Sequence, residues 1–118
     1  QVKSLIDSAD TINDIRLIVR KINIRGNLKE LGDQFRQSLN VKGIALIGTI
    51  QNEKPMIMCA ITDDLIDRIK ANHIVKEVSA IIGGGGGGKP HIATAGGKYL
   101  ENLNDASEKG KELIKSLM

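Results

Sequence analysis

Six consecutive glycines, Gly83 to Gly88, are followed by Lys89 and Pro90, and this stretch is the part of the sequence most suggestive of chemistry. It matches G-x-x-x-x-G-K, the loop with which nucleotide hydrolases bind phosphate, up to the last position of that motif. There Pro90 replaces the Ser or Thr whose hydroxyl would bind magnesium. The motif also requires a strand before the loop, whereas a helix is predicted before these glycines. We therefore reject a nucleoside-triphosphatase site.

Two other interpretations of the glycine run remain open. A run of glycine is usually a flexible spacer, because glycine loses the most conformational entropy when it is ordered. Against a spacer, apolar helices are predicted close on both sides, and a second pair, Gly96 and Gly97, follows soon after. The alternative is a bare backbone whose amide groups face an anion, with Lys89 adding its charge and Pro90 beginning a helical turn. Phosphate of a nucleic-acid backbone is the ligand that this alternative predicts.

We accordingly predict a nucleic-acid-binding site centred on the glycines. Its main members are the glycines and two lysines, and its weaker members are nearby cations and one aromatic residue, which either stacks on a base or anchors the last helix. The main members are Gly83, Gly84, Gly85, Gly86, Gly87, Gly88, Lys89, Gly96, Gly97 and Lys98, and the weaker ones are Lys70, Lys76, His91 and Tyr99. No nucleophile with a base, and no pair of acids, converges on the glycines. We therefore predict a binding module without catalytic residues.

The other reactive side chains have structural explanations. Cys59 is the only cysteine and lies in an apolar segment, which predicts a buried thiol and excludes an internal disulfide. His73 and His91 have no metal-ligand spacing with each other or with Cys59, so no metal site is expected. Helix capping and a solvated face account for three nearby aspartates: Asp63, Asp64 and Asp67.

The length and composition suit one soluble domain of modest size. The chain has 118 residues, a net charge of +3 and a pI near 9.1, which mildly favours an anionic partner. No apolar run is long enough to span a bilayer, so no membrane partner is expected, and the lone cysteine suits a reducing cytoplasm. Because the chain begins at Gln1 without a Met, we expect a fragment of a longer protein.

The elements that would position the glycines describe a single compact α/β domain, in which helices pack against a small mixed β-sheet and a Gly-rich loop joins helices. Residues 15–22 alternate as a strand, and residues 44–50 and 55–62 form a hairpin around the polar turn 51–54. Asn27 and Glu30 resemble a capping box that begins a helix. Further helices are expected near residues 62–69, from Asn72 to Ile82, and from Ala106 to Leu117.

Residues 74–98, IVKEVSAIIGGGGGGKPHIATAGGK, closely resemble the C-terminal, DHH-associated domain of bacterial alanyl-tRNA synthetases. In that family a helix containing VKE runs into a glycine cluster, followed by a basic residue, Pro, a segment ending in A-x-A-G-G and a last helix. The resemblance covers the chain from about Ile12. It predicts that residues 1–11 are the end of a connecting helix from an absent upstream region and that residues 12–118 are the globular domain.

Three residues depart from the family pattern, and one of them is Asn72, which stands where Gly is usual. The family commonly has Arg at the position of Lys89 and an acidic residue at that of His91. Lys keeps the positive charge but loses the bidentate geometry of Arg. The same domain accompanies DHH-family phosphodiesterases, where His typically follows the glycines at once, so Lys89 and Pro90 favour the synthetase.

The resemblance implies a tRNA-binding C-terminal module that helps to position tRNA(Ala) for aminoacylation and editing, with a role in self-association. The parent enzyme would be a cytoplasmic alanine–tRNA ligase. ATP and zinc are expected only on its absent domains, so this chain alone carries no cofactor and no catalysis. Two alternatives remain: an oligomerisation domain with incidental RNA contact, and the substrate-binding domain of a DHH-family phosphodiesterase.

Overall fold

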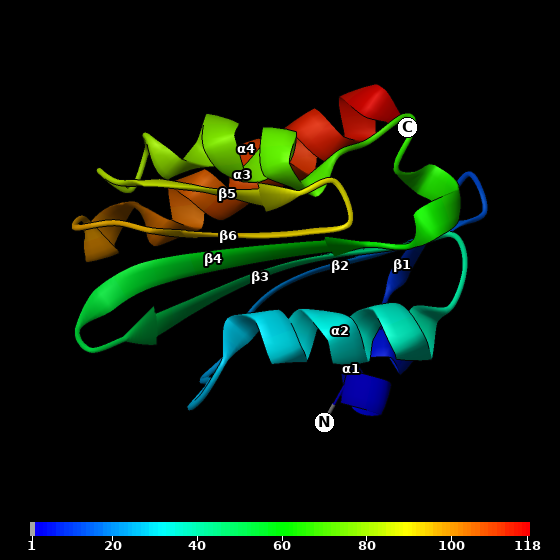
Figure 1. Cartoon of the computed structure of the whole chain (residues 1–118), viewed down its shortest axis with the longest axis horizontal. Helices are drawn as coiled ribbons and strands as arrows, with labels where there is room; N and C mark the ends of the chain where they lie inside the picture. Colours follow the sequence, from blue (N-terminus) through cyan, green and yellow to red (C-terminus); the bar gives the residue numbers. More distant parts are fainter. Residues whose placement is uncertain (1) are drawn as a thin grey trace.

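Residues 2–118, the part of the chain that this computed structural model describes, form a six-stranded mixed sheet with helices on both faces (Figure 1). The strands lie in the order β1-β2-β3-β4-β6-β5. The predicted α/β fold, a mixed sheet with packed helices, is confirmed. The elements are α1 (Val2–Asp7), β1 (Asp10–Ile12), β2 (Ile15–Lys21), α2 (Leu28–Leu39), β3 (Gly43–Gln51), β4 (Lys54–Ile61), the 3-10 helix η1 (Asp63–Leu65), α3 (Ala71–Ser79), β5 (Gly85–Lys89), β6 (Ile92–Gly96), the 3-10 helix η2 (Leu100–Asn102) and α4 (Leu103–Leu117).

The centre of the sheet is a β–α–β unit followed by a hairpin. β2 and β3 are parallel, and α2 connects them across one face, because parallel neighbours need a crossover. β3 and β4 are antiparallel and joined by the predicted polar turn. Asn52 and Glu53 in that turn have φ values of 51° and 65°. Two positive φ values match a type I′ turn, whose twist suits a two-residue hairpin.

Alternation along the strands sends apolar side chains into two separate layers. Ile15 and Leu17 of β2 lie in the layer under α3 and α4, whereas Ile18 lies in the layer under α1 and α2. This is the alternation predicted for residues 15–22. Figure 1 shows α2 on one side of the sheet and α3 with α4 on the other. The two sides of the glycine strand β5 therefore face different surroundings.

The first turn of α2 is held by its predicted cap. The Asn27 side chain accepts hydrogen bonds from the N–H groups of Lys29 and Glu30, at 2.8 and 3.2 Å. Within residues 2–118, no hydrogen bond runs from the Asn27 N–H to the Glu30 carboxylate, so only half of the predicted capping box is formed. Leu28, Phe35 and Leu39 then bury one side of the helix.

The helices after β4 differ from the prediction at their starts. The predicted helix after residue 62 is only the 3-10 turn η1. The Thr62 side chain does not cap it, and its hydroxyl accepts the Gly43 N–H at 3.1 Å. α3 begins at Ala71, and α4 begins at Leu103, before the predicted Ala106. Across residues 2–118 there is no helix of the length and apolarity needed to span a membrane.

The prediction of a Gly-rich loop between helices was wrong in its local structure. Gly85 to Lys89 form the edge strand β5, which pairs antiparallel with β6. Pro90 does not begin a helical turn but forms, with His91, the two-residue turn between these strands. The Pro90 and His91 carbonyls accept hydrogen bonds from Ala71 and Ile61, at 2.8 and 2.9 Å, which ties the turn to α3 and β4. Its fixed φ suits Pro to such a turn.

Candidate nucleic-acid interface

Every second glycine of the run is required for packing against β6. A Cβ at Gly84, Gly86 or Gly88 would overlap the main chain of the neighbouring strand. At Gly86, for example, the added atom would lie 2.5 Å from both the Cα and the Cβ of Ala95. Gly88 also has a φ of 150°, a backbone angle that residues with a side chain rarely adopt. These three glycines are explained by the fold alone.

Gly85 and Gly87 have no such explanation. Nothing lies within 4 Å of a Cβ built at either position. They share the α2 side of the sheet with their partners Gly96 and Thr94. α2 packs on β3, β4 and β6, and leaves this side of β5 exposed. The result is a strip of bare main chain open to solvent.

The outer edge of β5 carries unpaired main-chain groups. In a two-residue hairpin the closing pair, Lys89 and Ile92, is hydrogen-bonded, and hydrogen-bonded pairs then alternate with non-hydrogen-bonded ones. This alternation directs the N–H and C=O groups of Gly86 and Gly88 away from β6. Among residues 2–118, neither N–H has a main-chain partner outside the sheet. Two amide donors beside Lys89 are therefore available to an anion.

A hollow of about 170 Å³ lies beside this strip and brings Lys29 next to Lys89. Lys29 comes from the first turn of α2 and was not predicted as a site residue. Neither lysine takes part in an ion pair within the described part of the chain. Nothing in the local sequence marks Lys29, because only the crossover of α2 between β2 and β3 carries it across to β6. The hollow is lined by Lys29, Gly87, Gly88, Lys89, Ile92, Ala93 and Thr94.

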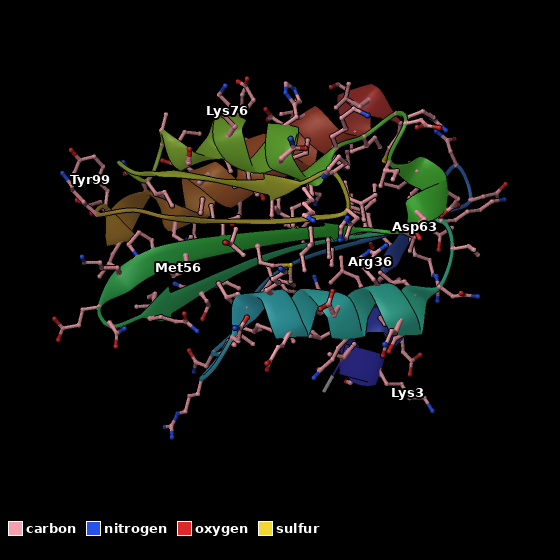
Figure 2. All side chains as sticks on the ribbon, in the orientation of Figure 1. Lys3, Arg36, Met56, Asp63, Lys76 and Tyr99 are labelled. Atoms are coloured by element: carbon pink, nitrogen blue, oxygen red, sulfur yellow. The ribbon has the colours of Figure 1, made fainter. Side chains whose placement is uncertain are left out.

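Tyr99 lies beside the start of the glycine run (Figure 2), and its neighbour Lys98 lies at the same end, whereas Lys89 ends β5. A Cβ at Gly83, where φ is 71°, would overlap the Tyr99 ring, so the ring packs directly on this glycine. The N–H groups of Lys98 and Tyr99 both donate to the Ile82 carbonyl, at 2.7 and 2.9 Å. Tyr99 thus anchors the start of β5, while 48% of its surface stays exposed.

The weaker predicted cations are scattered. Lys76 stands on α3 and points away from the sheet, on the side opposite α2 (Figure 2). The Lys70 ammonium donates to the Ile66 carbonyl at 2.8 Å, and its neighbour Ala71 is bonded to Pro90. Lys70 therefore lies near the turn that contains His91. The structure places Lys89, His91 and Lys70 around one end of β5, and leaves Lys76 apart.

The remaining reactive side chains serve the fold. Cys59 is fully buried, as predicted, and burial raises the pKa of its thiol to about 12. Asp63 pairs with Arg36, and both carboxylate oxygens of Asp64 accept the Lys42 N–H, at 3.2 and 3.0 Å. Burial pushes the pKa of Asp64 up, but these hydrogen bonds and one from Thr62 outweigh burial and lower it. Across residues 2–118, no three His, Cys, Asp or Glu side chains gather as metal ligands.

Known proteins with similar sequences are alanine–tRNA ligases. The chain is 34% identical over 119 residues to the enzyme of Natranaerobius thermophilus, and 35% identical over 117 residues to that of Dehalococcoides mccartyi. The alignments cover 98% and 97% of this chain but 13% of each relative. The chain thus spans about an eighth of the length of these relatives, and the sequence resemblance to the synthetase family is confirmed.

Two solved structures share the fold. The C-Ala domain of Aquifex aeolicus alanyl-tRNA synthetase matches 92% of this chain and 96% of its own length, with a TM-score of 0.75 and 23% identity. A pGpG-specific phosphodiesterase of Vibrio cholerae matches 98% of this chain and 37% of its own length, with a TM-score of 0.56 and 14% identity. The model of the DHHA1 domain matches residues 14–116, nearly the whole chain. The chain therefore belongs to the DHHA1 domain family.

Proposed function

We propose that this domain binds tRNA and helps an alanine–tRNA ligase to position it for aminoacylation and editing in the cytoplasm. The observation that carries the proposal is the bare strip at Gly85 and Gly87, which the fold does not require. It lies beside two lysines that have no ion-pair partner among residues 2–118. Glycine permits close approach of another backbone, and lysine attracts phosphate. The relatives are named alanine–tRNA ligases, and we therefore propose tRNA as the nucleic acid.

Fluorescence anisotropy with labelled tRNA(Ala), measured over a range of KCl concentrations, tests this function. Binding should weaken steeply with salt, because each neutralised phosphate releases counterions. Lys89→Ala should weaken binding and flatten the salt dependence, whereas Lys109→Ala, on an exposed part of α4, is the matched control. Wild-type affinity of Lys89→Ala at every salt concentration would contradict a role for Lys89, and no binding by the unmodified chain would contradict the function.

Self-association is a second candidate function, favoured by the unpaired outer edge of β5. An exposed edge strand offers N–H and C=O groups to a strand of another chain. Sedimentation velocity of the chain, with and without tRNA, separates the two functions. A monomer that binds tRNA would exclude self-association as the primary role, and a dimer that binds no tRNA would establish it.

A further inference from the structure

We propose that an unpaired RNA strand lies on the α2 side of the sheet, in a groove that runs from Lys89 past Lys29 to Arg25. This inference rests on the tRNA-binding function proposed above and adds the path of the RNA. It assigns binding roles to Arg25 and Lys29, and it places the RNA on the opposite side of the sheet from Lys76.

The groove consists of three adjoining hollows. The hollow of about 170 Å³ between Lys29 and Lys89 shares Lys29 and Thr94 with a second one of about 270 Å³. The second continues past Gly26 and Gln51 into a third, of about 400 Å³, which Arg25 lines. Because neighbouring hollows share lining residues, the three adjoin one another around the N-terminal end of α2.

The far end of the groove is held in place by hydrogen bonds. The Gln51 side chain donates to the carbonyls of Ile24 and Gly26, at 3.2 and 2.9 Å. The buried Thr49 hydroxyl accepts the Ile24 N–H at 3.2 Å. The residues on either side of Arg25, Ile24 and Gly26, are therefore hydrogen-bonded to β3, although this segment lies in the connection between β2 and α2. A cation held this way loses less backbone entropy when a ligand binds.

Three cations line the groove without internal partners. Within residues 2–118, Arg25, Lys29 and Lys89 form no ion pair and donate no side-chain hydrogen bond. Glu30, which follows Lys29 in α2, lines a fourth hollow together with Arg25 and Gly26. The Asn27 side chain already accepts hydrogen bonds from the first N–H groups of α2. The helix therefore contributes the charge of Lys29 to the groove and not free amide donors. Charge complementarity therefore selects a polyanion as the ligand.

The dimensions of the groove favour one strand over a duplex. Two of the hollows, of about 170 and 270 Å³, are smaller than pockets for drug-sized ligands, which have volumes of about 300–1,000 Å³, so each hollow suits only a small piece of a strand. The hollow of about 170 Å³ is lined by Gly87, Gly88, Ile92 and Ala93 as well as by Lys29 and Lys89. This lining fits a base against the apolar residues with phosphates beside the lysines. Positively charged grooves that follow a backbone are typical of single-strand binding.

Anisotropy titrations with tRNA(Ala) over a KCl series test the path. Arg25→Ala, Lys29→Ala and Lys89→Ala should each reduce affinity roughly two- to fivefold and lower the salt slope by about 0.7. Lys76→Ala and the control Lys109→Ala should leave both unchanged. Thermal unfolding of each variant, with Arg25→Gln as a second substitution, checks that any loss of binding is not a loss of fold.

The outcomes separate this inference from the function on which it rests. If the unmodified chain binds tRNA but Arg25→Ala and Lys29→Ala bind with wild-type affinity and slope, the path is wrong and the function stands. A loss confined to Lys76→Ala would also overturn the path. If the unmodified chain binds no tRNA, the function fails and the path fails with it. Equal affinity for a fully paired RNA duplex of matched length would overturn the assignment to an unpaired strand.

Discussion

Substituting neighbouring glycines of β5 by alanine separates the glycines that the fold needs from those kept for a ligand. At Gly86 an added methyl overlaps the main chain of Thr94 and Ala95, which cannot turn aside as a flexible side chain would. Overpacking of this kind costs about 1–3 kcal/mol. At Gly87 the same methyl enters open space, and its φ is not positive. Lower entropy of the unfolded chain then stabilises the protein by about 0.4–1 kcal/mol.

The two variants should therefore shift the free energy of unfolding in opposite directions, by a difference of about 1.5–4 kcal/mol. Urea denaturation followed by circular dichroism measures both shifts, with Gly85→Ala as a second open position. Gly87→Ala should also bind tRNA less tightly than the unmodified chain, although it is more stable, because its methyl narrows the hollow beside Lys29. Equal destabilisation of Gly86→Ala and Gly87→Ala would refute the packing argument, and unchanged tRNA affinity of Gly87→Ala would refute the role of the open glycines.

Three further predictions concern the rest of the chain. Asn27→Ala removes the cap of α2 and should lower the free energy of unfolding by about 0.5–2 kcal/mol in urea denaturation. Because its raised pKa and burial keep the Cys59 thiol protonated and inaccessible, a thiol reagent at pH 7 should label the chain only as fast as it unfolds, and rapid labelling in native buffer would contradict this. The lowered pKa of Asp64 stabilises the fold above the ordinary carboxyl value of 3.8, so Asp64→Asn should be less stable than the unmodified chain at pH 7, with a difference that shrinks below that pH.

Most of the elements followed from the spacing of apolar residues. The alternation of residues 15–22 and the two apolar runs around the polar turn predicted β2, β3 and β4, since each strand has a buried side. The spacing of Leu28, Phe35 and Leu39 predicted α2 in the same way. Where apolar side chains face a core, their spacing in the sequence reflects the helical or strand geometry of the backbone. The prediction of secondary structure failed where the residues have no side chains to show such a spacing.

β5 is the clearest example of that failure. Glycines have no side-chain period and a low tendency to form strands, so the run predicted a loop. The run is a strand because β6 lies beside it and β6 is itself paired with β4 through residues 56–60. The turn at Pro90 follows from the same register, which leaves two residues between Lys89 and Ile92. Tertiary pairing, which no local pattern encodes, decides both.

In the candidate site, too, the residues that are close in the sequence were predicted, and those that only the tertiary structure brings together were not. The glycines and Lys89 were predicted because they adjoin in the chain, and residues adjoining in the chain stay close in any fold. Lys29 and Arg25 precede Gly87 by about sixty residues, and they reach the same groove only through the crossover of α2 and the bonds from Gln51. A binding surface assembled in this way has its exposed glycine backbone on one segment and most of its cations on another. Neutralising Lys89 alone should therefore weaken RNA binding without abolishing it, because Lys29 and Arg25 still hold the strand.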